Sequence, residues 1–218
     1  VGGTQGYVQS RANPYLSWEK TNTFNIGIDF ALFKNRLNGT IEYYNKKGTD
    51  LLASTMGVPT EGWGYSTYTI NNGEMYNRGV EISLNGEILR TKDFSWRANM
   101  TYAYNKNKVT YVNVKAPMYI LQLDYPSAYP IIGNEYNAIY GYKWAGLNEE
   151  GLPQVYDEKG EKTTEQPTTL DAISYLGTTT PKYSGSFGTS VSYKDFDLSL
   201  QFLFAGGHKL RNANPAFL

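Results

Sequence analysis

The sequence predicts an all-β fold, specifically a segment of a transmembrane antiparallel β-barrel. The evidence is a pattern that occurs three times, in which a short polar turn joins two runs of strictly alternating apolar and polar residues. An alternation with a period of two puts one set of side chains on each face of a strand. One apolar face, one polar face and roughly ten residues per strand are typical of a membrane barrel wall.

The first two hairpins are expected at about residues 18–45 and 78–107, with turns at 34–36 and 90–93. The apolar positions of the first are Phe24, Ile26, Ile28, Phe30, Leu37, Gly39, Ile41 and Tyr43. Those of the second are Val80, Ile82, Leu84, Gly86, Ile88, Phe94, Trp96, Ala98, Met100, Tyr102 and Tyr104. Glu87 and Arg97 fall on the opposite, polar face, which faces the lumen of a barrel. Their opposite charges on adjoining strands predict that they pair.

The third hairpin is expected at about residues 183–206, with its turn at 194–195. Its apolar positions are Tyr183, Gly185, Phe187, Thr189, Val191, Tyr193, Phe196, Leu198, Leu200, Phe202 and Phe204. The connections between hairpins, about 45–73 and 107–180, are much longer than the turns. Short periplasmic turns and long extracellular loops are typical of outer-membrane barrels. The second connection is long enough to predict a further strand pair, around 136–146 and 151–156.

Composition excludes several other classes. Lys plus Arg equals Asp plus Glu at 20 each, so no broad attraction to nucleic acid is expected. The chain contains no run of eighteen apolar residues, as a membrane-spanning helix would require. It has no cysteine, which excludes disulfides and thiolate metal sites. The 20 tyrosines suit aromatic girdles at the two membrane interfaces.

The expected strands, about seven or eight, could close only the narrowest barrel, so an arc of a wider barrel is favoured. An open arc would leave unpaired strand edges in lipid, which predicts that further strands come from elsewhere in a longer chain. The first residues show no signal peptide and the last are rich in turn formers, so we expect both ends to be cuts within that longer chain.

Several short motifs of the sequence resemble those of a known protein family. The letters NPYLSWEKT at 13–21 and NIGIDF at 25–30 resemble a passage of SusC/RagA-type TonB-dependent outer-membrane transporters. Further matches follow in the same order at 35–37, 43–47, 49–52, 72–75, 77–81, 104–109, 140–144 and 180–183. The resemblance covers nearly the whole chain, although residues 112–129 match no motif.

The resemblance implies a 22-stranded barrel, of which residues 1–218 would be a C-terminal part. It also implies an N-terminal plug and a TonB box outside this sequence, coupling to TonB–ExbB–ExbD. A SusD-like surface lipoprotein would cap the barrel as a lid. The location implied is the outer membrane of a Gram-negative bacterium, with the strands crossing it repeatedly in contact with lipid.

Aromatic residues of the two long connections are the candidate substrate-binding residues, because aromatic faces stack on sugar rings or peptide side chains. They are Trp63, Tyr65, Tyr68, Tyr119, Tyr125, Tyr129 and Trp144. Each of them could instead serve girdle or loop packing.

No catalytic residue, cofactor or metal ligand is predicted. His208 is the only histidine and reads as a polar residue at a strand end. The acidic residues of 149–161 lie in a Gly/Pro-rich loop and read as solvated turn residues, with calcium binding left open. Paired carboxylates for glycoside hydrolysis would need opposed groups across a cleft.

The function expected is therefore not enzymatic. The chain would form part of a transporter that imports oligosaccharides or peptides. Two alternatives remain: a passive porin-like channel, and a soluble β-sandwich that binds carbohydrate and turns the same apolar face into a core.

Overall fold

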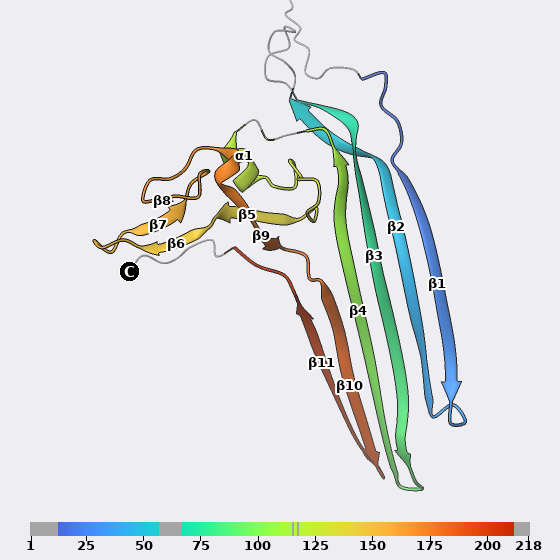
Figure 1. Cartoon of the computed structure of the whole chain (residues 1–218). Coiled ribbons are helices and arrows are strands. Elements are labelled where there is room, and N and C mark those ends of the chain that lie inside the picture. Colours follow the sequence, from blue (N-terminus) through green and yellow to red (C-terminus); the bar gives the residue numbers. More distant parts are fainter. Residues whose placement is uncertain (1–12, 57–66, 115, 117, 212–218) are drawn as a thin grey trace, which may run out of the picture.

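The computed structural model describes residues 13–56, 67–114, 116 and 118–211. Six long strands form one antiparallel sheet in the order β1-β2-β3-β4-β10-β11 (Figure 1). They are β1 (Lys20–Leu32), β2 (Leu37–Met56), β3 (Thr67–Arg90), β4 (Phe94–Val112), β10 (Tyr183–Tyr193) and β11 (Phe196–Gly206). The sheet is an open, partial barrel, as the sequence predicted, and we call it the wall.

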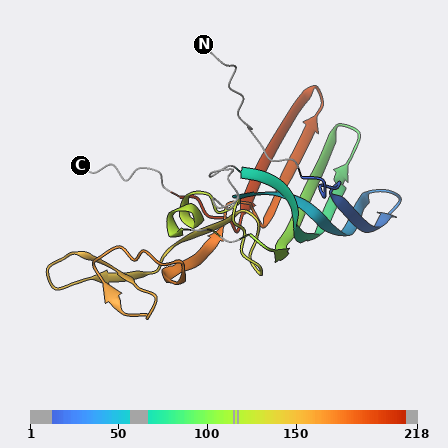
Figure 2. The same cartoon turned by 90° about the horizontal axis from the view of Figure 1, so that it is seen from above.

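Between the adjacent strands β4 and β10 the chain makes a long detour, residues 113–182, which we call the excursion. It contains α1 (Tyr119–Asp124), β5 (Ala138–Tyr142), β6 (Trp144–Leu147), β7 (Pro153–Tyr156), β8 (Lys162–Thr163), a 3-10 turn η2 (Leu170–Ala172) and β9 (Ile173–Thr178). These strands form two small sheets, β5-β9 and β6-β7-β8. The excursion lies at the end of the wall opposite the hairpin turns, and we call the two ends the excursion end and the turn end (Figures 1 and 2).

The excursion differs from the expected strand pair. The run 136–146 is divided between β5 and β6, and only β6 pairs with β7. Strand β5 pairs instead with β9, which the sequence analysis missed. β9 is only six residues long, and its consecutive residues Tyr175 and Leu176 are both exposed, so it shows no clear alternation. The strands beyond six therefore belong to separate small sheets and do not extend the wall in the described residues.

Strands β2 and β3 continue past the stretches expected to be strands, into residues 46–56 and 67–77. These extensions mix polar residues with apolar ones such as Leu51, Leu52 and Ile70 without a regular alternation, so the sequence pattern does not mark them. Backbone pairing continues through them, from Lys46 opposite Asn77 to Met56 opposite Thr67, with register shifts between Gly48 and Leu52. The connection between these strands is therefore much shorter than 45–73.

The apolar face of the wall is exposed along its whole length. Ile28 is 66% exposed and Phe202 57% exposed, although both belong to apolar rows that run straight across the strands. Within the described residues no second sheet covers this face, which excludes the β-sandwich alternative. The wall thus needs an apolar surrounding to be stable.

The buried apolar residues lie where the excursion meets the wall. Val109 of β4 is 3% exposed, and Ala138, Ile139 and Tyr140 of β5 form the largest group beside it. The end of β4 bonds to the excursion backbone, because Val109 donates its N–H to Asn134 and accepts from Gly133, each at 2.9 Å. This small core fixes the excursion to the wall.

Neighbouring strands approach one glycine of the apolar face, Gly39, so closely that no side chain fits there. A Cβ at Gly39 would collide with the Ser83 carbonyl oxygen and lie 2.8 Å from Leu84 Cδ2 and 3.1 Å from the Phe30 ring. Phe30 and Leu84 lie opposite Gly39 on the two neighbouring strands. Their side chains therefore fill the space that a side chain at position 39 would take.

Candidate functional site

The polar face of the wall carries rows of amides and hydroxyls. One row crosses the sheet through the cross-strand partners Asn38, Asn85 and Asn99, and continues through Gly188 to Gln201. A Cβ at Gly188 would lie 2.6 Å from the Asn99 amide oxygen, so the amides of Asn99 and Gln201 meet above this glycine. Side-chain amides both donate and accept hydrogen bonds, so this row can bind polar groups of either kind.

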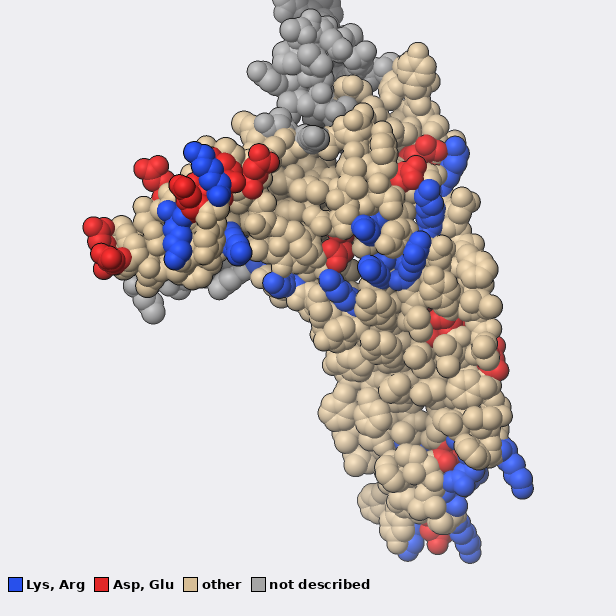
Figure 3. Space-filling view, in the orientation of Figure 1, with Lys and Arg blue, Asp and Glu red and all other residues tan. Residues whose placement is uncertain are grey.

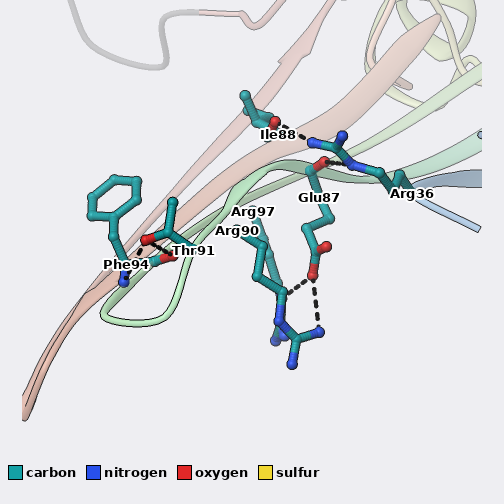
Figure 4. Close-up of polar contacts among 7 residues, drawn as sticks. All are labelled: Arg36, Glu87, Ile88, Arg90, Thr91, Phe94 and Arg97. Atoms are coloured by element: carbon teal, nitrogen blue, oxygen red, sulfur yellow. Dashed lines mark hydrogen bonds and ion pairs between the residues drawn. The ribbon is translucent and has the colours of Figure 1, made fainter.

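Charged residues cluster on the polar face at the turn end (Figure 4). Arg97 Nε lies 3.8 Å and Arg90 Nη1 3.5 Å from Oε2 of Glu87, which confirms the expected pairing of Glu87 with Arg97. Arg36 donates to the backbone oxygens of Glu87 and Ile88, at 3.3 and 2.7 Å. A β-bulge between Glu87 and Leu89 shifts the register here and returns Arg90 to the face of Arg97.

A polar pocket of about 370 Å³, which we call the junction pocket, lies where the excursion meets the polar face. Its polar lining is Asn77, Asn105, Lys106, Asn107, Glu135, Asn137, Thr178, Thr180 and Lys182. Asn107 Oδ1 accepts the backbone N–H of Tyr136 at 2.7 Å, and Asn107 Nδ2 donates to Asn77 at 3.0 Å. The pocket thus presents amides together with charges of both signs.

Glu135 is the centre of the pocket's charge network. Its Oε2 accepts a 2.6 Å hydrogen bond from the Tyr175 hydroxyl, and its Oε1 lies 3.1 Å from Lys182 Nζ. Burial is the largest single influence and raises the pKa of the Glu135 carboxyl, but the hydrogen bonds from Tyr175 and Lys182 outweigh it and the pKa is lowered. Burial first, and the bond to Glu135 second, raise the pKa of Tyr175.

The predicted aromatic residues do not gather in one site. Trp63 and Tyr65 lie outside the described residues, and Tyr68 lies in β3. Tyr119 begins α1, and Tyr125 and Tyr129 follow it, with Tyr129 lining an apolar pocket of about 390 Å³ beside α1. Trp144 lies in β6, on the arm of the excursion farther from the wall (Figure 1). Trp144 and Tyr125 are 59% and 61% exposed, so their rings are accessible, and their binding role stays a prediction.

Sequence reasoning missed the junction pocket. Glu135 lies between α1 and β5, Lys182 lies at the end of the excursion, and Tyr175, which bonds to Glu135, comes from the unpredicted strand β9. The available signal was the pair of motifs at 104–109 and 180–183, which contain seven of the residues that line the pocket.

The residues considered for metal binding have other surroundings. Asp157 Oδ1 accepts the N–H groups of Lys159 and Glu161, at 2.9 and 2.8 Å, so this carboxylate orders its own turn. His208 Nδ1 is buried and has no hydrogen-bond partner among the residues that the structure describes. No group of three or more His, Cys, Asp or Glu residues that could hold a metal ion occurs in the part of the chain that the structure describes.

The apolar face ends in a row of aromatic residues on each side, one at the excursion end and one at the turn end. At the excursion end, Tyr43, Tyr104 and Tyr183 share one row through Val80, which lies between the first two. At the turn end, Phe94, Tyr193 and Phe196 lie opposite one another. Tyr183 and Tyr193 are the two ends of the 11-residue strand β10, which at a tilt of about 40° spans roughly 25 Å along the membrane normal. That equals the height of a barrel's apolar band.

No helix in the described residues is both long and apolar enough to cross a membrane.

Comparison with known proteins agrees with this geometry. Residues 2–216 match the family described as TonB dependent receptor-like, beta-barrel. The chain belongs to this family. It is 30% identical over 222 aligned residues to TonB-dependent receptor P3 of Formosa agariphila, an alignment that covers 92% of this chain. It is 38% identical over 98 residues, 45% of this chain, to TonB-dependent receptor SusC of Bacteroides thetaiotaomicron.

Solved structures share this architecture. The RagAB peptide transporter matches with a TM-score of 0.72 and 27% identity over 89% of this chain, and the RagAB peptide importer in its open-open state with 0.73 and 26% over 92%. The outer membrane transporter YddB of Escherichia coli, at 11% identity and a TM-score of 0.52, shares the fold alone. The chain spans about 22% of the length of both the RagAB chains and the P3 receptor.

Proposed function

We propose that this chain is part of the wall of a TonB-dependent outer-membrane transporter that captures bulky nutrients, peptides or oligosaccharides, for import. The observation that carries the proposal is the two-faced wall. Its apolar face fits lipid between two aromatic rows, and its polar face fits a water-filled lumen. No covalent step is assigned to it, so the chain acts by binding.

The proposed orientation puts the hairpin turns in the periplasm and the excursion, within the expected loop 107–180, outside the cell. The contrast between short turns and long connections supports it. The connection between β2 and β3, within 45–73, would face outside as well. On this orientation the junction pocket opens near the mouth of the lumen, where an arriving nutrient first meets the wall.

Peptides fit the junction pocket better than neutral glycans. A peptide carries an ammonium group, a carboxylate and a backbone of alternating donors and acceptors. Glu135, Lys182 and the pocket amides offer complementary groups within one cavity of about 370 Å³. The RagAB relatives are named as a peptide transporter and importer, which supports the same substrate class.

The aromatic residues predicted from the two long connections would add stacking contacts of their own. A SusD-like lipoprotein would close the mouth as a lid, and TonB–ExbB–ExbD would supply energy through a plug and TonB box in the rest of the polypeptide. These partners are proposed from the family likeness to SusC and RagAB.

A binding experiment on the full polypeptide tests the proposal. The protein is extracted from outer membranes in detergent with its co-purifying partners, and calorimetry measures binding of a defined peptide mixture and of neutral oligosaccharides. We expect a lipid-anchored partner and peptide binding that Lys182→Gln weakens, while Lys162→Gln in β8 leaves it unchanged.

Two outcomes would overturn the proposal. A water-soluble protein that needs no detergent would contradict the membrane wall. Constant ion conductance in planar bilayers, with no saturable ligand, would favour the passive channel.

A further inference from the structure

The apolar side of the wall carries basic residues immediately beyond the aromatic row at the excursion end. In the first row past Tyr43 and Tyr104, Arg78 lies between its cross-strand partners Asn45 and Lys106. In the row after that, Lys47 and Lys108 lie on either side of Tyr76. We call Lys47, Arg78, Lys106 and Lys108 the cation belt. Figure 3 shows basic side chains gathered across this end of the wall, with a stretch of few charges between them and the turns.

The cation belt has too few carboxylates to balance it. Lys47 pairs with Glu74 at 3.2 Å, whereas Arg78, Lys106 and Lys108 make no salt bridge within the described residues. Arg78 and Lys106 face each other directly across strands β3 and β4. Like charges in that position are destabilising unless an anion lies between them.

The guanidinium of Arg78 is held in place. It lies 4.3 Å from the ring centre of Tyr76, and its Nε donates to Asn45 Oδ1 at 3.0 Å. Its two terminal amino groups have no hydrogen-bond partner in the described part of the chain. An arginine fixed in this way is prepared for an oxyanion, because less side-chain freedom is lost on binding.

The position of the cation belt indicates which anion it meets. It adjoins the aromatic row that bounds the apolar band, so it lies at the depth of lipid headgroups. Lys47, Arg78 and Lys108 lie on the apolar side of the sheet and do not line the junction pocket, whereas Lys106 lies at the edge of that pocket. At the turn end Lys92 and Lys194 are each followed by an aspartate, whereas Lys106 and Lys108 have no acidic neighbour in the sequence.

We propose that the cation belt binds the phosphate groups of lipid headgroups in the leaflet on the excursion side. The proposal rests on the membrane placement given under Proposed function. Phosphate oxygens would bridge Arg78 and Lys106 and relieve their repulsion, and Lys108 would add a third contact. The lipid would thereby be fixed beside the mouth of the transporter.

The test uses the full polypeptide with its partners in detergent, and native mass spectrometry to titrate lipid A, which carries phosphates, and dephosphorylated lipid A. The belt variant is Arg78→Gln/Lys106→Gln/Lys108→Gln. Each cation should contribute about a fivefold gain in affinity for lipid A, so we expect the loss of three to weaken binding on the order of a hundredfold. The affinity for the dephosphorylated lipid should not change. The control Lys34→Gln/Lys92→Gln/Lys194→Gln removes the same charge at the turns and should bind as the wild type.

Equal binding of lipid A by wild type and belt variant, or an equal loss in both variants, would overturn the proposal. So would full displacement of lipid A by inorganic phosphate, which would indicate a site for the free ion. If the belt variant does not fold, Lys106→Gln should weaken lipid A binding about fivefold and Lys106→Arg should retain it. Peptide binding is measured on the same samples. If the wild type binds lipid A but binds no peptide, the proposed transport function alone is contradicted. If it binds peptide but no lipid A, the proposed role of the cation belt alone is contradicted.

Discussion

Tyr175 donates a 2.6 Å hydrogen bond to the carboxylate of Glu135, 40 residues earlier in the chain. Glu135 also pairs with Lys182, where the excursion returns to the wall. The Glu135 side chain is only 19% exposed, so these two partners compensate for much of the water that it has lost. This link joins β9 to the segment before β5 and to the end of the excursion.

Replacing Tyr175 by Phe should loosen the excursion. The substitution removes one hydrogen bond to a charged group, which we expect to lower the local stability by about 1 kcal/mol because the site is partly exposed. Hydrogen exchange of the amides of β5 and β9 in the full-length protein measures the effect. Tyr125→Phe is the control, since no hydrogen bond of its hydroxyl is found in the described residues. Unchanged exchange in Tyr175→Phe would show that the link contributes nothing.

The same link predicts a pH window. The pKa of Glu135 is lowered from its usual 4.5, so its contribution to stability is present above that pH and is lost as the pH falls through the folded pKa. The pKa of Tyr175 is raised from its usual 10.0, so its contribution is present below pH 10 and is lost as the pH rises beyond it. Protection of β5 and β9 should therefore be greatest between about pH 5 and 10. Tyr175→Phe should remove the alkaline decline and leave part of the acid one.

A side chain at position 39 should destabilise the wall. Gly39→Val would place Cβ against the Ser83 carbonyl and the side chains of Phe30 and Leu84, and we expect a loss of about 1–3 kcal/mol. Urea unfolding in detergent, followed by the shift in gel mobility on heating, measures it. Gly86→Ala is a matched control on the same face, because its Cβ would meet nothing closer than 3.9 Å. Equal stability of both variants would contradict the packing described.

Trp96 and Thr189 form a hydrogen-bonded pair on the apolar face, and the effects of replacing them on stability should not be additive. Trp96 donates its indole N–H to Thr189 Oγ1 at 2.9 Å, across strands β4 and β10. Thr189→Val leaves that N–H without a partner in apolar surroundings, which should cost about 1–3 kcal/mol. Trp96→Phe in the same background removes the unpaired donor. The double variant should therefore lose less than the sum of the two single variants in a double-mutant cycle, and additive losses would argue against the bond.

The wall was predictable because each of its strands lies between two different environments. Ile28 and Asp29 must face opposite ways, so the sequence alternates wherever one face meets an apolar phase. Beyond Asn45 the strands leave the apolar band, and the alternation ends although β2 continues to Met56 and β3 begins at Thr67. The bulges near Gly48 and Glu87 could not be predicted from the sequence either, because an inserted residue changes the register of the strands and adds no periodic pattern to the sequence.

The candidate site was predictable only in part. The pairing of Glu87 with Arg97 followed from strands with known register. The junction pocket depends instead on Glu135, Tyr175 and Lys182, which come together through the fold of the excursion. Such contacts are distant in sequence and carry no periodicity, so single-sequence reasoning selected exposed aromatic residues and missed this charge network.

The excursion leaves the wall at the end of β4 and returns to it at β10, the strand that pairs with β4. Asn105 donates its backbone N–H to the Lys182 oxygen at 2.9 Å, and β4 and β10 then pair without interruption from Tyr104 opposite Tyr183 to Phe94 opposite Tyr193. The pairing of these two strands therefore sets no limit on the length of the excursion. Residues of the excursion that do not contact the end of β4 could change while the pairing of the long strands stays the same.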